Sequence, residues 1–303
     1  MTDVQNAPSA PSEREFTVAA RAQWRTVVRR FLRHRPAVLS LVTLFLITIW
    51  AFFFPLIWKW NFTERDKKVL SKGPRGAHPF GTDDLGKDVM ALVMRGIQRS
   101  LEVAVITTVI AVALGVVIGA IAGYFRGFVD AVLMRLTDLI LTLPLLVIVA
   151  VVSVSVPKAP WYIVPVILGL ASWTGLARIV RGEFLALREK EFVEAARAIG
   201  VSDRRIIFRH IMPNIAGPII VVATLAVAGA MLTETALSFL GLGIRPPEVS
   251  LGLLINTYQA AFKTRPWLFW FPAVSIVLIC LCVNFIGDGL RDAFDPKQTR
   301  VRS

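Results

Sequence analysis

The sequence predicts an all-α membrane protein with six transmembrane helices and both termini in the cytoplasm. Three observations predict this class. Hydrophobic residues make up 55% of the 303-residue chain, and the mean hydropathy is +0.63. The apolar residues gather in runs of about 20, the length that crosses a bilayer as a helix. Lys and Arg lie almost wholly between those runs, as in proteins whose spans are flanked by interfacial charge.

The chain begins with an arm, residues 1–36, that we expect to be cytoplasmic and partly disordered. Its first 20 residues contain prolines and small polar residues, and six arginines then precede the first apolar run. That run, 37–57, follows too long a polar arm for a cleavable signal peptide, so it predicts a retained first transmembrane helix. A polar extracytoplasmic loop, 58–98, comes next.

The remaining apolar runs predict a five-helix core at 99–290, followed by a cytoplasmic tail at 291–303. Each run is long enough, or nearly so, to cross about 30 Å of hydrocarbon as a helix. Pro144, Pro165 and Pro218 should kink the helices that contain them. A row of glycines in the second run, at 115, 119 and 123, favours close helix packing over pore lining. The five runs cover residues 103–123, 139–156, 161–179, 215–240 and 267–286.

The formal net charge of +13 comes from the loops. In a soluble chain this charge would favour nucleic acid as a partner. Here the basic residues flank apolar runs, so they indicate membrane lipid and no nucleic acid. With the amino terminus inside, 21 of the 34 Lys and Arg fall in cytoplasmic segments. This excess predicts the orientation, because cytoplasmic loops are enriched in Lys and Arg.

One stretch is similar to a phosphate-binding loop. Residues 81–88 read GTDDLGKD, one residue short of G-x-x-x-x-G-K-[ST]. However, no apolar strand precedes it, and Asp83 and Asp84 would place negative charge where phosphate binds. Asp88 also replaces the magnesium-binding hydroxyl. The loop is expected on the outer side, away from ATP, and we expect no catalytic, cofactor or metal site in this chain.

The informative polar segment is the predicted cytoplasmic loop 183–214, between the fourth and fifth runs. Residues 183–199 predict one helix with Phe192, Ala195, Ala196 and Ile199 on a single face. Gly200 is a suitable helix stop. Ser202 or Asp203 would cap a second short helix, and Pro213 would begin the return to the membrane. Such a corner either packs against its own bundle or docks a cytoplasmic protein.

This segment carries a resemblance to a known family. Glu194, Ala195, Ala196, Gly200 and Pro213 reproduce the E-A-A, three residues, G, then terminal P pattern of the coupling loop in ABC importer permeases. His210 and Met212 depart from the Ile and Leu usual in that pattern. The stretch RHIMPN, residues 209–214, is nevertheless similar to the variant found in the oligopeptide and dipeptide permease C-subunit family. Three further stretches resemble that family: HPFGTDDLGKDV at 78–89, LSFLGLG at 237–243 and FIGDGLRDAFDP at 285–296.

The resemblance implies a permease of the bacterial plasma membrane with the type I ABC importer fold and no enzymatic activity of its own. It implies a second homologous permease, one or two ATPase subunits or a fused ATPase that carry ATP and magnesium, and an extracytoplasmic peptide-binding protein. Peptide is the implied substrate. The residues implied for coupling to the ATPase are Glu191, Phe192, Glu194, Ala195, Ala196, Ile199, Gly200, Arg209, His210 and Pro213.

Three residues are predicted to line the translocation path: Glu234, Asn256 and Asn284. Glu234 lies near the outer end of the fifth run, where an ionisable residue marks a functional candidate. It either meets the charged amino terminus of a peptide or pairs with a neighbouring helix. Asp130 and Asp138 flank Arg135 and predict an interfacial ion pair with it.

Other transport classes remain alternatives. An ion-coupled secondary transporter usually has more spans and several intramembrane carboxylates, and a channel or scaffold needs no docking corner. An importer of nickel, glutathione or another small solute within the same permease family is also open. The segment GIRPPEVSLGLLI at 243–255 resembles the oligopeptide branch.

Overall fold

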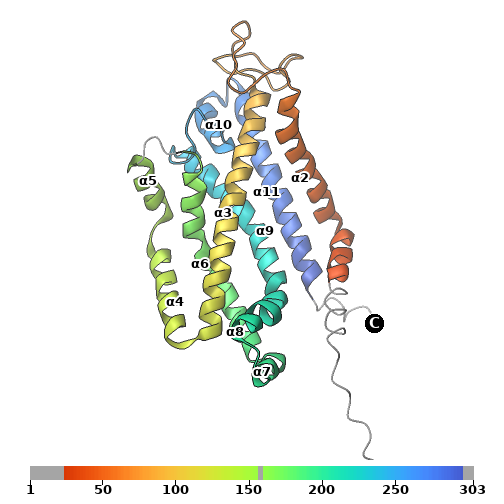
Figure 1. Cartoon of the computed structure of the whole chain (residues 1–303). Coiled ribbons are helices and arrows are strands. Elements are labelled where there is room, and N and C mark those ends of the chain that lie inside the picture. The colour runs from red at the N-terminus through yellow and green to blue at the C-terminus, as the bar shows by residue number, and fades with distance from the viewer. Residues whose placement is uncertain (1–23, 156–159, 296–303) are drawn as a thin grey trace, which may run out of the picture.

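The computed structural model describes residues 24–155 and 160–295. Within these ranges the regular secondary structure is helical, apart from two isolated bridges in the loop that follows the first span. The helices run side by side in one elongated bundle (Figure 1). The predicted all-α fold is therefore confirmed. The arm up to residue 23, the tail beyond residue 295 and the end of the third predicted run lie outside the described residues.

Five of the described helices are long and apolar enough to cross a membrane, and one bent pair adds a sixth span if it is counted as one. Most helices extend beyond the predicted apolar runs, because polar turns continue the helix past the hydrocarbon. The second span differs most, since Asp88 caps the helix well before the apolar run and accepts a hydrogen bond from the Ala91 amide at 2.9 Å. The five helices are α2 (Arg35–Phe53), α3 (Val89–Phe125), α6 (Ile163–Arg188), α9 (Met212–Phe239) and α11 (Pro266–Phe294).

The third predicted run is not a straight helix. It is divided into α4 (Gly127–Thr142) and α5 (Leu145–Ser155), whose axes differ by 74°. Pro144 lies in the break and Leu143 before it is extended, because proline disfavours helical geometry at the preceding residue. The kink expected at Pro144 is therefore a break. The kink expected at Pro165 is wrong, since this proline lies in the first turn of α6, where no helical hydrogen bond is lost.

Shorter elements connect the spans. The turn η1 (Phe54–Leu56) ends the first span, and residues 24–33 form a helix before it. The others are α7 (Glu191–Ala198), α8 (Asp203–Arg205), the π-helix η2 (Ile206–Ile211), α10 (Leu251–Tyr258) and η3 (Gln259–Ala261).

The bundle has two distinct ends (Figure 1). α7 and α8 project at one, here called the α7 end, and α10 lies at the other, the α10 end, beneath the loop between α2 and α3. Trp24 packs edge-on against Phe294 with the ring centroids 5.7 Å apart. Both described ends of the chain therefore lie together. The side of the membrane that each end faces stays a prediction.

The glycine row predicted for the second run is the contact between α3 and α6. A methyl group on Gly119 would lie 2.5 Å from the carbonyl oxygen of Ala177 and 2.8 Å from Cβ of Val180. Gly115 and Gly123 face α6 in the same way. Small residues at four-residue spacing let two backbones approach closely in a membrane. The expectation of close packing is confirmed.

The GTDDLGKD stretch forms a tight loop at the α10 end. Asp83 is 1% exposed, and its Oδ1 accepts hydrogen bonds from the amides of Leu85 at 2.9 Å and Lys87 at 2.7 Å. Its Oδ2 accepts one from the Tyr258 hydroxyl at 2.9 Å. Converging backbone amides are what a phosphate loop offers its ligand. In this chain the carboxylate of Asp83 already occupies them, so the loop is a structural turn.

Candidate functional site

The polar segment between α6 and α9 forms the candidate site, and it folds into two helices where the sequence predicted one. α6 continues to Arg188, the chain turns at Glu189 and Lys190, and α7 begins at Glu191. Lys190 is extended, with φ −86° and ψ 145°. The turn directs α7 back toward the bundle, so that its apolar residues reach a buried cluster instead of continuing into water.

One face of α7 anchors it. Val193 is fully buried and Ala196 is 6% exposed. Both pack into a cluster with Phe184 of α6 and with Ile206 and Ile211 of the π-helix. The predicted apolar face is therefore wrong in part. Ala196 turns inward together with Val193, whereas the other residues predicted for that face, Phe192, Ala195 and Ile199, are exposed.

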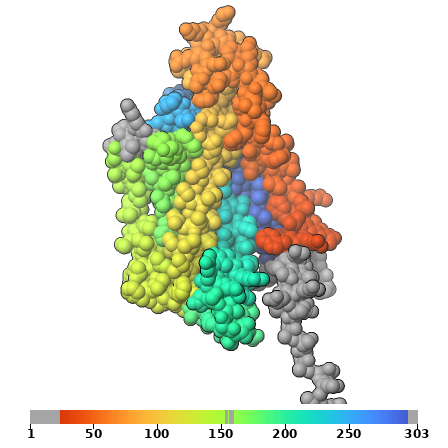
Figure 2. All heavy atoms as spheres, viewed as in Figure 1, coloured from red at the N-terminus to blue at the C-terminus, as the bar shows by residue number. Residues whose placement is uncertain are grey.

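The outward face of α7 carries apolar side chains beside its charged ones. Phe192 is 42% exposed and Ile199 is 81% exposed, and Phe208 on the neighbouring π-helix is 63% exposed. All three belong to the tip that α7, α8 and the π-helix form at the α7 end of the bundle, which projects from the rest of the molecule (Figure 2). Ala195 is also exposed. Exposed large apolar residues at a protruding tip indicate a partner.

The end of α7 is a sharp corner built on glycine. Gly200 has φ +79°, a conformation that side chains other than glycine rarely adopt. Its amide bonds to the carbonyl of Arg197 at 3.1 Å, and the amide of Val201 bonds to the carbonyl of Ala196 at 3.0 Å. These two bonds form a Schellman motif. Glu191 and Glu194 are exposed in the first turn of α7, where negative charge favours the helix dipole.

The second short helix predicted after Gly200 is in fact the start of the fifth span. α8, the π-helix and α9 are continuous from Asp203 to Phe239. Pro213 lies in the first turn of α9, and the wider π turns before it accommodate the missing proline amide. Arg209 is exposed and His210 is half-buried within those π turns.

Sequence reasoning missed the residue that joins this corner to the spans. Tyr124, at the last turn of α3, is 4% exposed, and its hydroxyl donates a hydrogen bond to Oδ1 of Asp203. Its carbonyl accepts a bond from the Arg188 guanidinium. The guanidinium of Arg197 lies 5.7 Å from the centre of its ring. Tyr124 therefore contacts α6, α7 and α8 together, and we call these four residues the Tyr124 junction.

The acidic residues of α4 pair differently from the prediction. Asp130 binds Arg181 through two hydrogen bonds of 2.5 and 2.6 Å, and Asp138 binds Arg178 at 2.6 Å. Both arginines belong to α6, so these pairs join two spans. Arg135 is exposed on α4. The expected pairing with Arg135 is therefore wrong, because α4 turns both aspartates toward α6.

Glu234 lies in a buried polar cluster at the α10 end. Its side chain is fully buried and accepts hydrogen bonds from the hydroxyls of Ser100 at 3.0 Å and Ser238 at 2.6 Å. Ser100 also accepts a bond from the amide of Leu251, the first residue of α10. Glu234 thus joins α3, α9 and α10. Its surroundings favour the helix-pairing alternative over direct contact with a substrate.

The other two predicted path residues lie on different helices. Asn256 is half-buried on α10 and donates a hydrogen bond to the Phe239 carbonyl at the end of α9. Asn284 is exposed on α11 and bonds back to the Cys280 carbonyl at 2.9 Å. Neither contacts Glu234, so the three residues do not form one site in the described chain.

A second charged cluster, not predicted from the sequence, closes the α10 end. Arg99 of α3 makes two hydrogen bonds of 2.9 Å to the Glu248 carboxylate in the loop before α10, and Arg95 adds a third of 2.9 Å. The Arg99 guanidinium also lies 3.9 Å from the ring centre of Trp161. These bonds hold the pKa of Glu248 below its ordinary value, chiefly through the bond from Arg99.

The chain matches two protein-family models. One, described as binding-protein-dependent transport system inner membrane component, matches residues 115–300. The other, the N-terminal TM domain of oligopeptide transport permease C, matches residues 22–74. The chain is 44% identical to the oligopeptide transport system permease protein OppC of Mycobacterium tuberculosis, over 91% of this chain and 95% of that protein. It is 41% identical to OppC of Escherichia coli (strain K12), over 93% and 94%.

A solved structure has the same fold. A chain of the MetNI methionine ABC transporter, in an inward-facing conformation, superposes on this chain with a TM-score of 0.55 and 18% sequence identity. The superposition covers 68% of this chain and 98% of the MetNI chain. The likeness at this identity concerns the fold alone, which is the ABC importer permease fold that the resemblance implied. On the family match and the extent of the OppC identity, the chain belongs to the binding-protein-dependent transport system inner membrane components and is a multi-pass protein of the bacterial inner membrane.

Proposed function

We propose that this chain is a permease subunit of an ATP-driven importer of oligopeptides or dipeptides. The relatives named oligopeptide transport system permease protein support the substrate class, because identity of 41–44% extends over at least 91% of this chain. The observation that carries the coupling role is the apolar tip formed by α7 and the π-helix. It projects from the bundle and exposes Phe192, Ile199 and Phe208.

The partner that covers this tip is a cytoplasmic ATPase, present as one or two subunits or as a fused protein, which carries ATP and magnesium. Amphipathic helices commonly dock in apolar grooves, and α7 is short, anchored on one face, and exposes Phe192 and Ile199 on the other. Glu194, Arg209 and the corner at Gly200 would form the polar rim of that contact. The chain itself supplies no catalytic residue in this proposal.

Coupling requires that a displacement of α7 reaches the spans. The Tyr124 junction supports this step, because it connects α6, α7 and α8 to the end of α3. α3 in turn packs along α6 through glycines. We propose that closure of the ATPase moves α7 and α3 together, as rigid segments that turn about the bundle.

The remaining partners follow from the family. A second homologous permease completes the translocation path, and an extracytoplasmic binding protein delivers the peptide. The exposed apolar residues along α4 and α5, such as Phe128 at 83% and Val147 at 54%, would face that permease or lipid. Asn256 and Asn284 remain predicted residues of the translocation path. Glu234 would not contact the substrate, and would instead stabilise the position of α10 beside the path.

The test is uptake of a radiolabelled tripeptide by cells that express the whole transporter with Gly200→Pro in this chain. Proline cannot adopt φ +79° and lacks the amide that bonds to Arg197. We expect insertion and pairing with the second permease to persist while the ATPase no longer co-purifies and uptake falls to background. Gly182→Ala is the control, since Gly182 is exposed on α6 with open space around it. Normal uptake with Gly200→Pro would refute the coupling role.

Loss of the Gly200→Pro chain from the membrane would indicate a folding defect, and Ile199→Asp then serves in its place. Ile199 is 81% exposed, so a charge there leaves the fold intact. It weakens only the binding of a partner whose surface is apolar. ATPase retained on Ile199→Asp would refute the proposed docking face.

A further inference from the structure

The helix formed by residues 24–33 is attached to the α7 end of the bundle by one face only. Val27 is 7% exposed, and the Arg30 guanidinium donates a hydrogen bond of 3.0 Å to the Asp295 carbonyl. Trp24 contacts Phe294 through its ring edge, and His34 lies 3.5 Å from the Asp292 carboxylate. These contacts fix the helix against the end of α11.

The rest of this helix is amphipathic and uncovered. Trp24, Val28 and Leu32 recur every four residues and are 49%, 54% and 61% exposed. Together with the stems of three arginines they line a shallow hollow of ≈ 510 Å³. The arginines follow the same spacing one position later, at residues 25, 29 and 33.

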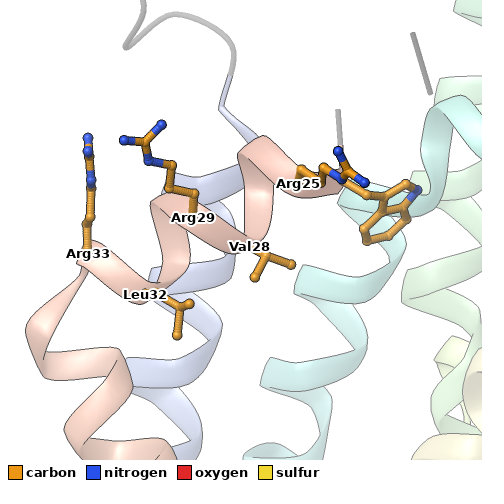
Figure 3. Close-up of a pocket in the computed structure, with 6 residues that line it drawn as sticks. Arg25, Val28, Arg29, Leu32 and Arg33 are labelled. Carbon is orange, nitrogen blue, oxygen red and sulfur yellow. The ribbon is translucent and has the colours of Figure 1, made fainter. Parts of the chain in front are cut away.

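The apolar and basic side chains form adjacent rows that diverge from the helix. In Figure 3 Arg29 and Arg33 point away from the spans, Val28 and Leu32 point toward the level of the spans, and Arg25 extends sideways along the helix. α2 begins at Arg35, so the helix lies where the first span enters the membrane. A helix with an apolar face toward the acyl chains and a basic face toward the headgroups is the form that lies in a membrane interface.

We propose that residues 24–33 form an in-plane helix that binds anionic phospholipid. The apolar face lies against the upper acyl chains, and the three arginines bind the phosphates of an anionic headgroup. Arginine suits this role because its stem packs on apolar surface while the guanidinium reaches phosphate. The segment 24–33 contains no Asp or Glu, so no internal acid competes with the lipid. This site is independent of the docking surface at α7.

Charge complementarity also separates an anionic lipid from a zwitterionic one. Each basic residue near an anionic surface strengthens binding about fivefold, so three arginines give about a 100-fold preference. Arg30 is not counted, because it is bonded to Asp295. A protein partner is the other candidate occupant, but a basic row beside an apolar row at the entry of a span favours the bilayer.

The lipid preference is tested on the full-length chain in nanodiscs of phosphatidylcholine and phosphatidylglycerol. Mass spectrometry measures the ratio of the two lipids retained after gentle extraction. Changing Arg25, Arg29 and Arg33 to Gln should lower the retained phosphatidylglycerol at least about threefold, and changing all three to Lys should restore most of it. The control removes three exposed charges from the loop after α2: Arg65, Lys67 and Lys68 to Gln. An equal loss in that control would overturn the proposal.

The orientation is tested by labelling with a membrane-impermeant maleimide. Val28→Cys and Arg29→Cys are compared in a chain whose buried Cys280 and Cys282 are changed to Ala. In nanodiscs Val28→Cys should react at least tenfold more slowly than Arg29→Cys, and the difference should shrink in detergent. Equal rates in the bilayer would overturn the in-plane helix. Protection of Val28→Cys only when other subunits are co-expressed would assign this face to a protein and refute the lipid site.

Discussion

The contact between α3 and α6 allows a sharp test of how the spans are held together. The perturbation is Gly119→Ala. The added methyl group would lie 2.5 Å from the Ala177 carbonyl oxygen and 2.8 Å from Cβ of Val180. Ordinary contacts are 3.4 Å or longer, and neither neighbour is the free end of a flexible side chain. The two helices must therefore separate along the row.

The magnitude follows from two opposing effects. Overpacking of a close contact costs about 1–3 kcal/mol, whereas alanine is favoured over glycine within a helix by about 1 kcal/mol. The net change is a loss of about 0–2 kcal/mol, accompanied by loosening of every contact between α3 and α6. Gly119→Leu removes the ambiguity, because its side chain would have to displace α6 outright.

The assay is thermal unfolding of the purified chain in detergent, followed by tryptophan fluorescence. Gly175→Ala is the matched control on α6, because Gly175 is exposed and nothing lies within 4 Å of its added methyl group. That control should raise the midpoint, since only the helix propensity changes. If Gly119→Ala stabilised the chain as much as Gly175→Ala, the close approach of α3 and α6 at this glycine would be refuted.

Three other changes give distinct outcomes. Tyr124→Phe removes the hydroxyl that binds Asp203, so the ATPase should still bind while the number of peptides transported per ATP hydrolysed falls. Asp203→Asn keeps an acceptor for that hydroxyl and should retain more of this ratio. Equal ratios in wild type and Tyr124→Phe would exclude the coupling role of the Tyr124 junction. Ser100→Ala removes one of the two hydroxyls that donate to the buried Glu234 and the hydroxyl that accepts from the Leu251 amide, so the free energy of unfolding should fall by about 1–3 kcal/mol. Because the folded-state pKa of Glu248 is lowered, its stabilisation should be complete above pH 4.5 and be lost only as the pH falls through the lower folded value. The thermal midpoint should thus be level from pH 7 to pH 5 and drop more steeply in acid in wild type than in Glu248→Gln; parallel curves would contradict this.

The sequence predicts the spans well because hydrophobic length is a local property. The apolar runs identify five long helices directly, and the spacing of the glycines at 115, 119 and 123 identifies the tight contact of α3. Gly200 is likewise recognised as a helix stop, since its left-handed backbone favours glycine whatever lies around it. Each of these features depends on residues within a few turns of one another.

Features set by distant residues were predicted poorly. Asp130 and Asp138 were paired with the nearby Arg135, but their partners Arg181 and Arg178 lie 51 and 40 residues away. Periodicity alone placed Ala196 with the exposed residues of α7. The turn after Arg188 rotates that helix, and nothing in the sequence of α7 encodes the rotation. The Tyr124 junction was missed for the same reason, because its four members come from four helices.

The length of α3 gives the molecule a mechanical property. Its 37 residues form a rod of about 55 Å, nearly twice the thickness of the hydrocarbon that it crosses. One tip is fastened by Asp88 within the loop at the α10 end, and the other bears Tyr124. A tilt of about 5° about the midpoint would displace both tips by about 2 Å in opposite directions. A small rotation at one membrane surface is thereby converted into a shift at the other that is large enough to break or form a hydrogen bond.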